Sequence, residues 1–146
     1  MKDEIKRIAL REGASKVGIA SVESFAGAPN GYAPADFIPD AKSVISFGVR
    51  LLDAAVERDR LFMNSQMIPE ELRMPVQEYI YETVAYGMVN VLLDRIGLLI
   101  ALFLEKCGYP SMCFPATYDT YYESLMSKIP NFQAFFLIGM LLLGLA

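Results

Sequence analysis

The feature that most constrains the fold is a long stretch without proline, Val76 to Lys106. Proline is excluded from helix interiors, and apolar residues recur here at helical spacing. These residues are Val84, Met88, Val91, Leu92, Ile96, Leu99 and Phe103. The stretch predicts one long helix, or two helices joined by a bend near Gly87 or Gly97, with this apolar stripe facing inward. Gly108 follows as a left-handed cap.

Three other segments predict short strands. Lys16 to Ala20 is apolar and rich in β-branched residues, and Lys42 to Arg50 combines such residues with turn residues in front. Ser111 to Phe114 is a third candidate, which Pro115 ends. Runs of this length and composition are typical of strands.

Shorter helices are expected before and between these strands. Asp3 to Arg11 forms an amphipathic pattern, with Ile5, Ile8 and Ala9 on one face. Ala35 to Ile38 is expected to make one helical turn, and Asp53 to begin a short helix. Pro69 to Glu71 indicates a further helix start. The series helix, strand, strand, long helix, strand predicts an α/β or α+β class. We expect a small sheet of about three or more short strands, packed against the long helix and the N-terminal helix, as an incomplete domain.

Composition limits the chemistry. Histidine is absent from the 146 residues, and only Cys107 and Cys113 carry thiols. A zinc or iron–sulfur site normally needs three or four protein ligands, so no metal site and no cofactor are expected in this chain alone. We expect two reduced, partly buried thiols in a cytoplasmic protein. The charged first residues are not followed by the apolar core of a signal peptide.

The charge pattern bears on partners. Net charge is −4, and the basic residues are scattered rather than clustered. Nucleic-acid binding needs a basic surface, so no nucleic-acid partner is expected. Asp94 and Arg95 interrupt the most apolar part of the long helix, which argues against a membrane span there. The uncharged tail Phe132 to Ala146 is shorter than the ~20 residues that a span needs.

The order of segments resembles a known family. GASKVGIA (Gly13 to Ala20) and IPDAKSVI (Ile38 to Ile45) are similar to the two opening strands of the epoxyqueuosine reductase and reductive dehalogenase-like oxidoreductases. The resemblance continues through the tyrosine-rich helix that ends in LEKCGY and into CFPAT, residues 79–117. The match covers about residues 10–130. It implies a truncated amino-terminal part of such an enzyme, with residues 1–130 as the related domain and residues 131–146 as a separate apolar tail.

The resemblance implies cobalamin and [4Fe–4S] clusters for full-length relatives. Their cluster cysteines and acidic proton donor come far downstream of the matching part, so no catalytic residue is carried over and we expect the chain to be inactive alone. Any ligand contact is expected at four positions on the matching helix and strand end: Tyr81, Tyr86, Asn90 and Thr117.

The tail suggests a frameshift near residues 131–137. With one choice of codons, Leu137 to Ala146 reads in a shifted frame as His-Arg-His-Ala-Ala-Val-Gly-Leu-Gly, which is similar to a histidine motif of the family. The unshifted tail is expected to fold back over the sheet or to join two copies in a homodimer. Two alternatives stay open: a small dimerising α/β interaction or regulatory module without enzymatic activity, and a protein that the tail attaches to a membrane.

Overall fold

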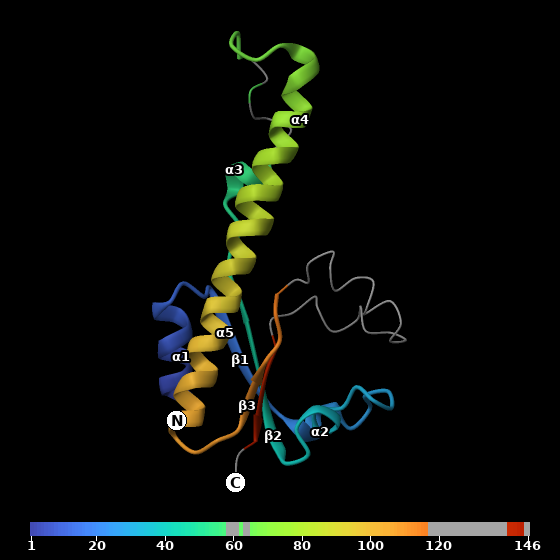
Figure 1. The fold of residues 1–146 in the computed structure, drawn as a ribbon, viewed down its shortest axis with the longest axis vertical. Coiled ribbons are helices and arrows are strands. Elements are labelled where there is room, and N and C mark those ends of the chain that lie inside the picture. The colour runs from blue at the N-terminus through green and yellow to red at the C-terminus, as the bar shows by residue number, and fades with distance from the viewer. Residues whose placement is uncertain (58–61, 63–64, 117–139, 145–146) are drawn as a thin grey trace.

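The computed structural model describes residues 1–57, 62, 65–116 and 140–144, the last range by its backbone. Four strands form one antiparallel sheet: β1 (Lys16–Ser21), β2 (Ala41–Gly48), β3 (Ser111–Cys113) and β4 (Met140–Gly144). Their order across the sheet is β1-β2-β4-β3 (Figure 1). The three predicted strands are confirmed, and the purely antiparallel pairing makes the class α+β.

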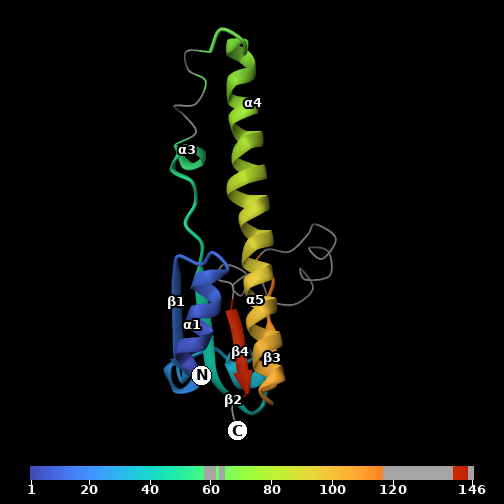
Figure 2. The same ribbon diagram turned by 90° about the vertical axis from the view of Figure 1, so that its left-hand side faces the viewer.

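The core lies between this sheet and two helices, α1 (Lys2–Arg11) and α5 (Val89–Lys106). Figure 2 shows both helices in front of the sheet. Ile5, Ile8 and Ala9 of α1 are buried, as their spacing predicts. They meet buried residues of β2 and α5, namely Ile45, Phe47, Ile96, Ile100, Ala101 and Leu104. The expected packing of a small sheet against a long and an N-terminal helix is confirmed.

The long helix continues over 37 residues, Glu70–Lys106, in three parts. These parts are α4 (Glu70–Ile80), the π-helix η3 (Tyr81–Met88) and α5. Only α5 covers the sheet, and α4 projects well beyond it (Figure 1). The helix begins at Glu70, which confirms the helix start expected at Pro69 to Glu71, and Pro75 is accommodated inside α4 before the proline-free stretch. Gly87 lies in the π-helix, whereas Gly97 lies within α5.

The inward face of α5 differs from the predicted stripe. Met88 and Val91 were expected inward, yet they are 62% and 69% exposed. The buried face instead carries Ile96, Gly97, Ile100, Ala101 and Leu104. Because apolar residues occur around nearly the whole of α5, spacing alone cannot select the buried side. The small residues Gly97 and Ala101 let the helix approach the sheet, and they select it.

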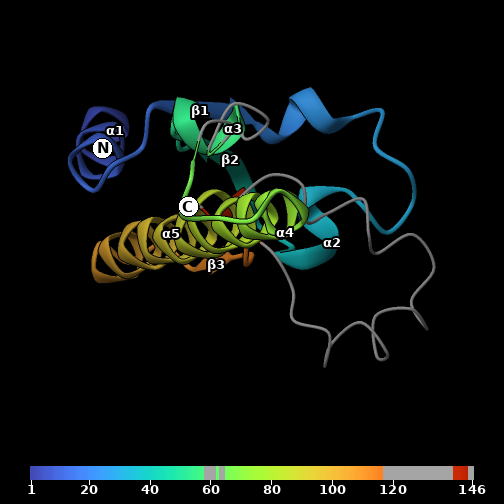
Figure 3. The ribbon, with the colours of Figure 1, turned by 90° about the horizontal axis from the view of Figure 1, so that it is seen from above.

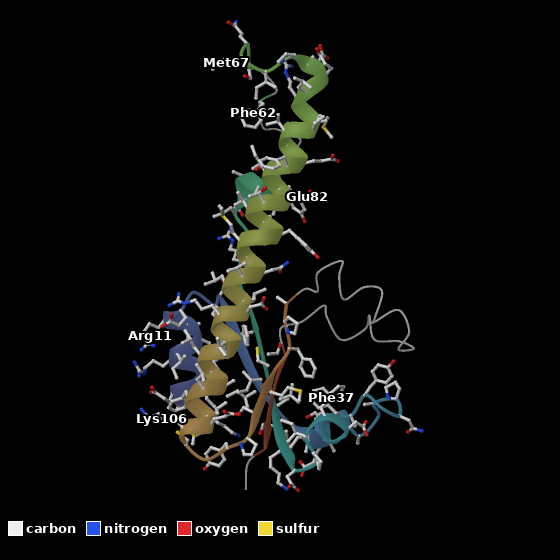
Figure 4. All side chains as sticks on the ribbon, in the orientation of Figure 1. Arg11, Phe37, Phe62, Met67, Glu82 and Lys106 are labelled. Carbon is white, nitrogen blue, oxygen red and sulfur yellow. The ribbon has the colours of Figure 1, made fainter. Side chains whose placement is uncertain are left out.

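In the connection from β2 to α4, α3 (Asp53–Val56) lies beside the long helix (Figure 1) and contacts η3. At the far end, the Arg73 guanidinium donates hydrogen bonds to the carbonyl oxygens of Ser65 (3.0 Å) and Ile68 (3.3 Å). Met67 lies at this tip (Figure 4) and is 93% exposed. The predicted short helix that begins at Asp53 is confirmed.

The connection from β1 to β2 lies at the opposite end of the sheet from α4 (Figure 1). It holds a short 3₁₀ helix, η1 (Val22–Phe25), and α2 (Pro34–Phe37), which confirms the predicted helical turn. Seen from above, α2 lies on the opposite side of the sheet from α1 (Figure 3). The rings of Phe37 and Phe114 meet edge to face, with centroids 5.2 Å apart, and so tie α2 to the segment after β3.

The expected tail is only partly described. Met140–Gly144 forms β4, which pairs with β2 on one side and β3 on the other. Both backbone edges of this segment are therefore used inside its own chain. The expected boundary near residue 130 and the remainder of the tail lie outside the described residues.

Candidate functional site

Three of the four predicted ligand residues lie on the long helix. Tyr81 and Tyr86 belong to the π-helix, and Asn90 lies in the first turn of α5. Tyr81 and Asn90 are half-buried, whereas Tyr86 is 56% exposed. The fourth, Thr117, lies outside the described residues. A π-helix within an α-helix is common at functional sites, so this region is the leading candidate.

Asn90 carries the one polar anomaly that the structure describes on α5. Its Nδ2 atom is buried and has no hydrogen-bond partner among the described residues. Buried amide donors are nearly always paired in folded proteins. The side chain can therefore still donate to an acceptor that reaches it.

Asp94, one turn further along α5, fixes the end of the described strand segment. Its Oδ1 atom accepts a hydrogen bond of 2.6 Å from the backbone N–H of Ala116. A charged acceptor strengthens such a bond. The bond holds the chain that leaves β3 against the helix, one turn from Asn90.

Below this bond, α5 and β3 approach very closely. A Cβ atom at Gly97 would overlap Cys113 Sγ and lie 3.4 Å from the Phe47 ring. Burial, and secondarily the nearby Asp94 carboxylate, raises the pKa of the Cys113 thiol. The thiol therefore stays protonated at neutral pH, and a protonated thiol is a weak nucleophile. Cys113 is a packing residue here.

The second thiol, Cys107, is exposed at the end of α5, and both cysteines are free. The expectation that both thiols are partly buried is wrong for Cys107. Within the described ranges, no group of three or more His, Cys, Asp or Glu side chains is arranged to hold a metal ion.

An ion-pair cluster joins the two helices of the core. The Glu12 carboxylate, 14% exposed, receives the guanidinium of Arg11 and that of Arg95, each at 3.0 Å. Glu12 ends α1 and Arg95 lies on α5, so the cluster fixes the angle between them. Sequence reasoning did not identify it, because nothing local connects residues so far apart in the chain.

The helix Glu70–Lys106 is also long and apolar enough to span a membrane, judged by length and composition. Core helices of soluble proteins pass the same test. Here 28% of the most apolar 18-residue segment of this helix is buried within the described fold.

Searches of protein-family models, curated proteins and solved structures found no match to this chain. No relative therefore adds to what the described geometry indicates. It offers a half-buried amide donor beside a π-helix and a large apolar surface, which are features suited to binding.

Proposed function

We propose that this chain is the amino-terminal part of an oxidoreductase of the epoxyqueuosine reductase-like type, cytoplasmic and inactive by itself. The ordered resemblance of residues 10–130 to that family supports the proposal. A [4Fe–4S] cluster needs about four thiolate ligands, and the chain has only Cys107 and Cys113, so the clusters do not fit this chain. They would belong to the downstream part of such an enzyme.

The observation that carries the proposal is the apolar surface of the projecting helix. Four large side chains on it are half or more exposed: Leu72 (50%), Met74 (51%), Tyr79 (70%) and Tyr86 (56%). Glu82 also projects from this part of the helix (Figure 4). Exposed surfaces of this kind usually mark places where further polypeptide packs. The part of the reductase that carries the clusters would cover it.

Cobalamin fits the candidate residues better than the clusters do. Its ring carries peripheral carboxamides, whose oxygen atoms accept hydrogen bonds. Asn90 offers a buried donor that has no partner among the described residues, and the hydroxyl of a tyrosine can donate as well. Asn90, together with Tyr81 and Tyr86 of the preceding π-helix, would hold the edge of the corrin ring, while the cofactor supplies the redox chemistry when bound.

The nucleotide sequence beyond codon 130 gives the first test. A second reading frame that continues the family pattern supports the proposal, and the absence of such a frame contradicts it. If the frame exists, the frame-restored protein should show iron–sulfur and corrinoid absorbance after reconstitution, and the 146-residue chain should show no iron–sulfur absorbance.

The candidate residues are tested in the same frame-restored protein. Asn90→Ala should weaken corrinoid binding by about tenfold, the usual loss for one hydrogen bond. Lys106→Ala on the same helix is the control, because Lys106 is exposed at the opposite end of α5 from Asn90. Equal effects of both substitutions would contradict a specific role of Asn90.

A second function has its own support. The chain would be a small dimerising interaction or regulatory module without enzymatic activity, for which the exposed apolar residues of α5 are the supporting observation. The homodimer through the apolar tail stays a prediction, and so does attachment of that tail to a membrane.

A further inference from the structure

The outer face of α5 carries an ordered seam. Among the residues of this helix, the exposed ones are Val91, Arg95, Leu98, Leu102, Glu105 and Lys106. Met88, the last residue of the π-helix, precedes them and is 62% exposed. From Met88 to Glu105 the exposed positions alternate in steps of three and four residues. This is the spacing of the contact positions in paired helices.

Most of this seam is apolar. Val91 is 69% exposed, and Leu98 and Leu102 are each 54% exposed. An ordinary solvent-facing side of a surface helix carries polar residues instead. The opposite side of α5 is already buried against the sheet and α1, so the seam is a second apolar face.

The two charged positions of the seam define an orientation. Arg95 lies three residues before Leu98, and Glu105 lies three residues after Leu102. If two copies of α5 run antiparallel with their Ile100 residues at the same height, Leu98 of one copy faces the partner's Leu102. The same register would set Arg95 against the partner's Glu105. Charge and apolar contacts are satisfied together, which a parallel pair would not achieve because it would set Arg95 beside Arg95.

Arg95 is suited to this second contact. Its side chain is 63% exposed although it already donates to Glu12 Oε2 at 3.0 Å. A guanidinium has five N–H donors, so it can serve a carboxylate on each side. The bond to Glu12 also holds the side chain in place before a partner arrives.

We infer that the part of the seam from Arg95 to Glu105 joins two copies of this chain in an antiparallel, twofold-symmetric helix pair. Such an interface uses the same patch on both copies, so every substitution acts twice. The inference is independent of the proposed reductase relationship, because it uses only the described surface of α5. It also differs from a dimer formed by the apolar tail.

Sedimentation of the purified chain from about 1 to 100 μM tests the inference. The weight-average mass of the wild type should rise from 16.3 kDa toward twice that value. Leu98→Gln with Leu102→Gln should raise the dissociation constant by more than about 100-fold, because four buried leucines are lost from the dimer. Leu10→Gln on α1 is the matched control, since Leu10 is also 54% exposed, and it should leave association unchanged.

A charge variant tests the register and guards against a folding defect. Glu105 is exposed in the last turn of α5, so Glu105→Lys should fold normally, as circular dichroism would check. It should weaken the dimer by about tenfold or more, by repelling the partner's Arg95. Glu71→Lys on α4 makes the same charge change outside the seam and should have no effect.

Three results would overturn the inference. A wild type that stays monomeric over the whole range would assign the seam to a different protein. A dimer that resists Leu98→Gln with Leu102→Gln would lie elsewhere, for example at the apolar tail. A dimer that is sensitive to the leucine variants but not to Glu105→Lys would exclude the antiparallel register.

Discussion

Gly97 of α5 lies so close to Cys113 of β3 that no side chain fits between them. Gly97→Ala forces the helix and strand apart and should destabilise the fold by about 1–3 kcal/mol, the usual cost of overpacking. Urea denaturation measures the loss. In a Cys113→Ala background, which removes the sulfur atom, the same substitution should cost clearly less. Equal costs in both backgrounds would mean that the sulfur is not the obstacle.

Glu12 should contribute more to stability than the other carboxylates of α1. Glu12→Gln removes a 14% exposed carboxylate that pairs with Arg11 and Arg95, and it should cost about 0.5–1 kcal/mol at low salt. The loss should shrink as salt is added, because ionic screening already weakens the pair. Glu4→Gln, which removes the exposed partner of Arg7, is the control and should cost less.

The Cys113 thiol gives the fold a dependence on alkaline pH. Burial raises its pKa above the ordinary value of 9.0, so the folded state holds this proton more tightly than the unfolded state. The stability that this provides is complete below pH 9.0 and is lost as pH rises through the folded-state pKa. The urea concentration at the denaturation midpoint should therefore decrease as the pH is raised above 9.0. Cys113→Ala should make the midpoint less dependent on pH in this range. An unchanged profile would contradict the assignment.

The same burial predicts unequal alkylation of the two thiols. Iodoacetamide should modify the exposed Cys107 quickly and the half-buried Cys113 slowly, and mass spectrometry of timed samples would show the order. In urea the two rates should become similar. Rapid modification of both thiols in the native protein would contradict the close packing of β3 on α5.

Asp94 should protect the backbone amide of Ala116 from hydrogen exchange. Asp94→Ala removes the acceptor of that 2.6 Å bond and should cost about 1.5–3 kcal/mol, the range for bonds to charged groups. Asp94→Asn keeps an acceptor oxygen and should retain much of the protection. If both variants exchange equally fast, the charge rather than the hydrogen bond holds the segment.

Local patterns predicted most of the elements. The apolar face of α1, the strands β1, β2 and β3, and the glycine cap at Gly108 (φ 87°) all follow from residue spacing and turn residues. Each of these depends on neighbours within a few positions. Such local signals can be recognised in a single sequence.

What could not be predicted depends on contacts between distant segments. The buried side of α5 is selected by Gly97 meeting Cys113, which spacing does not reveal. The cluster of Glu12 and Arg95 likewise joins two helices across the fold. Of the candidate site, the placement of Tyr81, Tyr86 and Asn90 on one helix was predictable, whereas the π-helical turns and the buried amide of Asn90 were not.

The position of β4 in the sheet has a consequence for the order of folding. The pair β1 and β2 can form as soon as both strands have been synthesised, since they are near neighbours in the chain. In contrast, β3 pairs only with β4 in the described sheet, and β4 is made after it. Until Met140–Gly144 inserts, the backbone groups of both flanking strands stay open to other strands, so a nascent or nicked chain is exposed to aggregation at this gap.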